Sequence, residues 1–263
     1  MIKKLSTLSV MALAFAATPA LAQTGHVGLS YTSNDDFEYD TTAIEGAAAF
    51  AFGENFGAQI DGNIASVDDG GDSETGYRVN GHLFYNAGAA RIGGLFGYSK
   101  FDYSGIAPEA THWGVEGQYD FGRFTLGASA IWGDAEGIIS PELDYEQIDL
   151  RGNYYVTDNF VLGARYGFGN VENIGGDADT TDYSLDAEYQ FSSTPISLLA
   201  SFQHWEVDGT AVESDSFTIG ARWNWGGTLK ERDGAGFRNT PRSVVENFRS
   251  EEHTSELQSQ NAI

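Results

Sequence analysis

Charged side chains at alternate positions are the residues best placed to act on solutes. They recur between apolar neighbours along most of the chain. Rings of charged side chains set ion preference in pores, so a water-filled interior lined by them would sort ions. The alternative is a lumen that paired charges fill. The residues that we expect to line a pore are Glu45, Asp61, Arg78, Arg91, Glu116, Asp149, Arg151, Arg165, Asp186, Glu188 and Arg222.

The histidines are the other candidates for chemistry. His204 precedes Glu206 and Asp208, and a protease based on His and Asp would need such groups. However, neither a Gly-x-Ser-x-Gly elbow nor a His-Glu-x-x-His motif occurs in the chain. We interpret His204 as a solvent-exposed polar residue near the outer rim of the predicted barrel. We therefore expect no catalytic residues, no enzymatic activity and no cofactor.

Acidic segments raise the question of metal binding. Residues 35–40 and 68–74 are rich in aspartate and glutamate. Neither segment has the ligand offsets of a helix-loop-helix calcium site. We therefore expect no specific metal site, and at most loose bridging of divalent ions to lipid head groups.

Strands must position these side chains. Ser216–Trp225 places Phe217, Ile219, Ala221, Trp223 and Trp225 on one face and polar residues on the other, the period of a strand. Similar segments recur from residue 25 onward. The fifth is blurred, because Leu95 falls on the polar face. Aromatic residues gather near both strand ends, which predicts two membrane-interface girdles.

The turn signals alternate between short and long. Short breaks fall at 53–56, 86–90, 121–124, 157–159 and 192–195, and longer acidic breaks separate them. This order indicates about twelve strands, with short turns on one side and long loops on the other. We predict an all-β fold, a closed antiparallel up-and-down transmembrane β-barrel over residues 23–226. Its last strand, 216–225, pairs with its first, 25–32, because lipid tolerates no open sheet edge. A soluble β-sandwich is the alternative.

The two ends lie outside the barrel. Residues 1–22 have the charged start, apolar stretch and Ala20-Leu-Ala22 site of a secretory signal peptide. Residues 227–248 are either a native periplasmic tail or the product of a damaged reading of the gene sequence. Residues 249–263 resemble the translation of a sequencing adapter, so we interpret them as non-native.

Composition excludes several classes of partner and site. The chain has 263 residues, a formal net charge of −24 and no cysteine. Nucleic acid would be repelled by this charge, and disulfides and thiolate metal sites are excluded.

The chain resembles the small porin-like outer-membrane proteins of Gram-negative bacteria. The resemblance covers residues 1 to about 226. It depends on the signal peptide, the alternating strands and a closing strand that ends in Trp223 and Trp225. Such proteins usually end at that strand, whereas here residues 226–248 follow. The resemblance implies localisation in the bacterial outer membrane, in contact with lipid and lipopolysaccharide.

Two functions remain open. The first is a channel for passive diffusion of small hydrophilic solutes and ions, with a preference for cations. The second is a structural or adhesive barrel with a plugged lumen. A homo-oligomer is a further alternative, because small outward-facing residues could form a flat contact patch, although monomers also carry such residues. The outward-facing glycines here are Gly46, Gly62, Gly81, Gly117 and Gly152.

Overall fold

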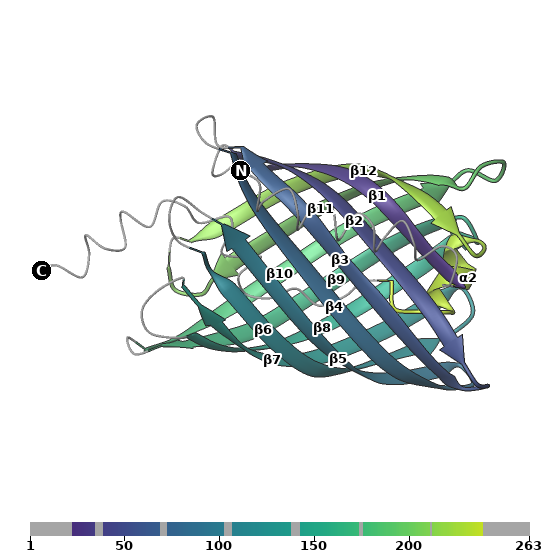
Figure 1. The fold of residues 1–263 in the computed structure, drawn as a ribbon, viewed down its shortest axis with the longest axis horizontal. Helices are drawn as coiled ribbons and strands as arrows, with labels where there is room; N and C mark the ends of the chain where they lie inside the picture. The colour runs from purple at the N-terminus through teal and green to yellow at the C-terminus, as the bar shows by residue number, and fades with distance from the viewer. Residues whose placement is uncertain are drawn as a thin grey trace, which may run out of the picture.

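The computed structural model describes residues 23–34, 39–68, 73–102, 107–137, 143–173, 176–210 and 212–238. They form one closed barrel in which each strand pairs with its neighbours in sequence (Figure 1). The strands are β1 (Thr24–Asn34), β2 (Tyr39–Phe52), β3 (Phe56–Asp68), β4 (Ser73–Ala87), β5 (Ala90–Asp102), β6 (Glu109–Asp120), β7 (Phe124–Glu136), β8 (Leu143–Thr157), β9 (Phe160–Asn173), β10 (Gly176–Gln190), β11 (Ile196–Val207) and β12 (Glu213–Trp225).

Pairing between β1 and β12 closes the barrel. The two strands run antiparallel in continuous register, from Gly25 opposite Trp225 to Asn34 opposite Ser216. The predicted closed barrel of about twelve strands is therefore confirmed, and with it the pairing of the first and last strands. Closure satisfies the backbone groups that an open edge would leave without partners in hydrocarbon.

The two-residue period separates the faces of the wall as the sequence predicts. Outward residues such as Leu83, Ile92 and Phe96 are 66%, 67% and 59% exposed. Their inward neighbours His82 and Arg91 are buried. The described residues contain no helix that is long and apolar enough to cross a membrane.

Aromatic residues occupy the outer face near both strand ends. Trp113 and Trp132 lie side by side toward the long-loop end, with ring centroids 5.0 Å apart. Phe56 and Tyr85 make an edge contact at the short-turn end. Amphipathic rings favour the membrane interface, so these positions fit the two predicted girdles.

The inner face is not uniformly polar. Leu95, whose place on the polar face blurred the strand pattern, does face inward and is 5% exposed. It belongs to a buried apolar cluster on β3 and β5–β9, mostly toward the long-loop end. Its members are Val67, Leu95, Phe101, Ala110, Ile131, Ala135, Leu143, Tyr145 and Val171. Packing these side chains together removes them from the water that a lumen would hold.

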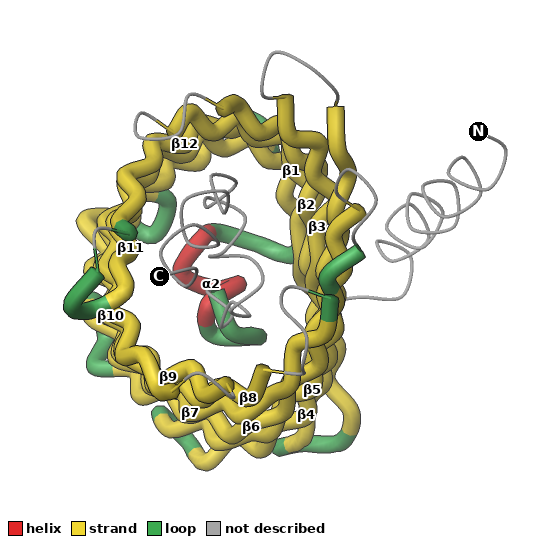
Figure 2. Tube along the Cα trace, turned by 90° about the vertical axis from the view of Figure 1, so that its left-hand side faces the viewer, coloured by secondary structure: helices red, strands yellow, loops and turns green. Residues whose placement is uncertain are grey.

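A short segment after the last strand turns back into the barrel. We call Gly227–Arg238 the lumen segment. It contains helix α2 (Leu229–Asp233), which Figure 2 shows inside the ring of strands. In Figure 1, α2 lies at the end where β12 finishes. The signal peptide and residues 239–263 lie outside the described residues.

Hydrogen bonds at its first turn start α2. Thr228 Oγ1 accepts a hydrogen bond from the backbone N–H of Glu231 at 3.2 Å. The Glu231 carboxylate accepts one from the N–H of Thr228 at 2.8 Å. This is a capping box, and it satisfies backbone donors that a helix start leaves unpaired. The same bonds lower the pKa of Glu231, the backbone one most.

Candidate functional site

One arginine joins strands on either side of the closing seam. Arg222 on β12 donates from Nε to Glu45 Oε1 on β2 at 2.6 Å, and from Nη1 to Glu188 Oε2 on β10 at 2.8 Å. Each partner lies two strands away from β12 in the ring. A forked guanidinium can hold two carboxylates at once, which an ammonium does less well. Arg222 therefore braces the wall where the sheet closes.

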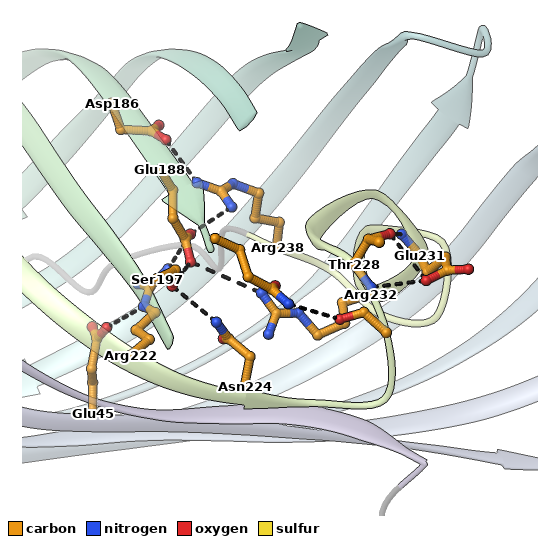
Figure 3. A network of polar contacts seen from close by, with 12 residues as sticks. Glu45, Asp186, Glu188, Ser197, Arg222, Asn224, Thr228, Glu231, Arg232 and Arg238 are labelled. Atoms are coloured by element: carbon orange, nitrogen blue, oxygen red, sulfur yellow. Dashed lines mark hydrogen bonds and ion pairs between the residues drawn. The ribbon is translucent and has the colours of Figure 1, made fainter. Parts of the chain in front are cut away.

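The lumen segment adds a second arginine to this cluster (Figure 3). Arg238 donates to Glu188 Oε2 at 2.8 Å and to Asp186 Oδ2 at 3.0 Å. Burial lowers the pKa of its guanidinium, but the two carboxylates outweigh burial and raise it. Arg232 lies farther from Glu188, at 3.9 Å, and burial lowers its pKa to about 10.

A second cluster spans β8, β9 and β10. Arg165 lies 2.7 Å from Asp149 Oδ1 and 3.0 Å from Asp182 Oδ1, and all three side chains are almost completely buried. Gly167 leaves the room that this cluster needs. A Cβ there would lie 2.2 Å from an oxygen of Asp182.

A histidine between two acids forms the third cluster. His82 Nδ1 lies 2.6 Å from Glu116 Oε1, and Nε2 lies 2.8 Å from Asp61 Oδ2. Carboxylates only accept hydrogen bonds when ionised, so both ring nitrogens must carry protons to satisfy them. His82 is therefore best described as an imidazolium that neutralises part of the charge of Asp61 and Glu116.

The lumen segment also wraps an arginine of the wall. The guanidinium of Arg91 donates to the carbonyls of Asp233 at 3.0 Å, of Gly234 at 2.5 Å and of Gly236. It lies over the rings of Phe84 and Phe237, 4.9 Å and 5.3 Å from their centroids. Such contacts replace the water that a buried cation loses.

Further polar contacts anchor the same segment. Tyr155 donates to Asp233 Oδ2 at 2.7 Å, and Lys230 donates to Asp120 Oδ2 at 2.6 Å. Gln59 donates to the carbonyl of Phe237 at 2.9 Å and accepts from its N–H at 2.7 Å. The anchors come from β3, β6 and β8, so the segment is held from several sides of the barrel.

A polar cavity lies in the lumen beside these clusters. Its volume is about 170 Å³, and β1–β4 and β9–β12 contribute its walls. Glu45, Asp61 and Asp186 face it together with Arg78, Arg165, Arg222 and Arg238. It lies largely across the lumen from the apolar cluster, next to the closing seam.

The residues that we expected to line a pore lie on the inner face, but they are gathered into clusters. Glu45, Glu188 and Arg222 meet directly, and Asp186 joins them through Arg238. Asp61 and Glu116 meet through His82, whereas Asp149 pairs with Arg165. Arg151 is buried beside Asp149, Arg91 holds the lumen segment, and Arg78 faces the cavity.

No pattern in the sequence predicted that the lumen segment would contact the wall of the barrel. Arg238, Asp233 and Phe237 all contact the wall. From the sequence, residues 227–248 were interpreted only as a periplasmic tail or as a damaged reading of the gene sequence. One signal was present: Thr228 followed three residues later by Glu231 is the pattern of a capping box. It predicts a helix start, but nothing in it predicts entry into the lumen.

A closed barrel with an apolar outer band and charged clusters inside defines an outer-membrane β-barrel protein. The family model for Gram-negative porins matches residues 24–231. The chain belongs to this family of Gram-negative porins, and it is an outer-membrane, porin-like barrel. The predicted class and outer-membrane localisation are thus confirmed.

Solved structures with this fold include two other porins. The NanC porin superimposes with a TM-score of 0.55 at 10% identity, covering 75% of this chain and 98% of that one. The KdgM porin superimposes with a TM-score of 0.51 at 9% identity, covering 76% of this chain and 99% of that one. The translocator domain of the autotransporter NalP from Neisseria meningitidis superimposes with a TM-score of 0.50 at 13% identity, covering 85% of this chain and 98% of that one. At these identities the likeness shows the fold alone. A comparison with curated proteins finds no match.

Proposed function

We propose that this porin lets small hydrophilic solutes and ions diffuse along the side of the lumen near the closing seam. The observation that carries the proposal is the polar cavity of about 170 Å³ between Arg222, Asp186 and Arg78. Across the lumen, the apolar cluster around Leu95 and Ile131 leaves few groups that could replace a solute's water shell.

The lumen segment narrows this route. Arg238 both faces the cavity and pairs with Glu188 and Asp186. Conduction through the intact chain is therefore restricted to small species, and local release of the segment widens the passage. A short segment held mainly by polar contacts can open locally at a lower free energy than the whole fold.

Selectivity is a separate part of the proposal. The charges that face the cavity nearly balance, because Glu45, Asp61 and Asp186 meet several arginines. The net charge of −24 is what favours cations, since a field of one sign raises the local concentration of counter-ions. We therefore propose a mild preference for cations. Contact with lipopolysaccharide and formation of a homo-oligomer remain proposals from the sequence.

Planar bilayers test the route and its selectivity together. Mature protein starting at Gln23 is compared with a variant that ends after Gly227, and both are recorded in a KCl gradient. We expect small conductance from the intact chain, larger conductance from the shortened chain, and a reversal potential of the sign that favours K⁺. A reversal potential that favours Cl⁻ would contradict the cation preference.

A structural or adhesive barrel with a plugged lumen is the second candidate. The many anchors of the lumen segment, from Arg91 to Tyr155, favour it. Liposome swelling in sugar solutions separates the two functions. Sugar entry with the intact chain supports the channel, whereas entry only after removal of the segment supports the plugged barrel.

A further inference from the structure

A cluster of metal-binding groups lies on the outer face of the barrel, away from the lumen. His204 and Glu206 on β11 share the outward parity of Ile196 and Leu198, and Glu213 and Asp215 lie opposite them on β12. We propose that His204, Glu206 and Glu213 bind a divalent transition-metal ion of the Zn²⁺ type. This inference is independent of whether the lumen conducts.

The orientation of the imidazole is the first support. His204 Nδ1 lies 2.7 Å from Asp215 Oδ1, so in the neutral ring the Nδ1–H donates to that carboxylate. The Tyr183 ring stacks on the imidazole at 4.9 Å between centroids, with 26° between the planes. These contacts leave Nε2 as the acceptor nitrogen. A carboxylate that holds the other nitrogen is the usual partner of a metal-binding histidine.

The three donors converge. Nε2 of His204 lies 3.8 Å from Glu206 Oε2. One ligand atom from each of His204, Glu206 and Glu213 lies within 4.8 Å of the others. Donors around tetrahedral zinc lie roughly 3.5 Å apart, because its bonds to nitrogen and oxygen are about 2.0–2.2 Å long. Small rotations of exposed side chains close the difference, and a fourth position is left for water.

Electrostatics supplies a reason for a cation at this point. Glu206 and Glu213 are directly opposite each other on paired strands. Like charges in that position destabilise a sheet. Asp215 adds a third carboxylate beside one imidazole. A divalent ion between the glutamates turns this repulsion into attraction.

The donor set also limits which ion fits. Calcium and magnesium prefer oxygen ligands only, whereas an imidazole nitrogen suits Zn²⁺, Cu²⁺ and Ni²⁺. A mixed set of one nitrogen and two carboxylates therefore favours zinc over the alkaline-earth ions. This differs from the sequence-based expectation of no specific metal, which considered only the acidic segments 35–40 and 68–74.

Calorimetric titration of ZnCl₂ into the mature barrel in detergent tests the site. The protein carries no affinity tag, and Ca²⁺ and Mg²⁺ are present in excess. We expect one zinc site that His204→Gln weakens at least about 100-fold and that Asp215→Asn weakens about tenfold, as for partners of a metal-bound histidine. Co²⁺ in place of zinc should show a visible absorption band that His204→Gln abolishes.

Asp144→Asn is the matched control. Asp144 lies near Asp134 and Glu146 on the outer face at the same end of the barrel, but in a set of lining residues without histidine. This variant should bind zinc as the unaltered protein does. Equal loss in Asp144→Asn and His204→Gln, or displacement of zinc by Ca²⁺, would overturn the proposal, because either result describes diffuse binding to acids. Heat-dependent gel mobility confirms that every variant is folded.

Discussion

Arg238 Nη1 lies 2.8 Å from Glu188 Oε2, and through this contact the chain beyond the last strand is joined to the inner wall of β10. The same carboxylate oxygen accepts a bond from Arg222 on β12. Glu188 thus belongs both to the wall and to the closure of the lumen. Its 1% side-chain exposure means that neither bond competes with bulk water.

Replacing Arg238 by alanine should loosen the lumen segment without opening the barrel. Glu188 keeps Arg222, so the wall remains paired, whereas the segment loses its bonds to two carboxylates. We expect its local stability to fall by about 1.5–3 kcal/mol, the range for a hydrogen bond to a charged group. Single-channel recordings should show more frequent and larger openings. Arg123→Ala is the control, because Arg123 lies on an exposed turn.

Replacing His82 by leucine should destabilise the whole barrel. The variant leaves Asp61 and Glu116 buried without the imidazolium between them. Loss of one partner from a buried ionic cluster costs about 3–5 kcal/mol. Urea unfolding in detergent micelles, followed by tryptophan fluorescence, measures the change.

A triple variant separates charge from packing. Asp61→Asn and Glu116→Gln, added to His82→Leu, remove the uncompensated charge while keeping the side-chain shapes. Most of the lost stability should return. If the triple variant is as unstable as His82→Leu alone, the ionic description of this cluster is wrong.

Replacing Gly25 by valine should hinder closure of the barrel. A Cβ at Gly25 would lie 2.3 Å from the Trp225 ring and 2.3 Å from the carbonyl oxygen of Ala47. Since these residues form the seam between β12, β1 and β2, the first and last strands cannot approach. We expect a lower yield of folded barrel on refolding into detergent, scored by heat-dependent gel mobility. Gly81→Val is the matched control, because a Cβ there meets nothing within 4 Å.

The stability of the first turn of α2 should depend on pH. The hydrogen bonds from Thr228 lower the pKa of Glu231, so their stabilising effect is complete above the ordinary glutamate value of 4.5. It is lost as the pH falls through the lowered value in the folded protein. The lumen segment should therefore become easier to cleave below about pH 4.5.

Limited proteolysis with pepsin over a range of acidic pH checks this dependence. Glu231→Gln removes the titrating group, so the difference in cleavage between it and the unaltered protein should shrink as the pH falls. A difference that stays constant through this range would exclude Glu231 as the titrating group. Thr228→Ala should loosen the segment by about 1 kcal/mol at all pH values above this range.

The sequence by itself determined the wall of this protein. Alternating residues such as Phe217, Ile219 and Trp223 predict which side of a strand faces lipid, because successive side chains point to opposite faces. The pattern also excludes odd shifts in the pairing of β12 with β1, since a shift by one residue would turn every apolar group inward. Even Leu95, the exception in the pattern, was placed on the inner face correctly.

Only the tertiary structure decided which side chains meet, both on the inner face and on the outer face. Arg222 finds Glu45 and Glu188 two strands away on either side, and His204 meets Glu206 and Glu213 through the β11–β12 hairpin. The local period of two gives a side chain its face, but its partners depend on the stagger of the closed barrel. The return of Arg238 into the lumen depends on contacts with distant strands, which no local pattern in residues 227–238 encodes.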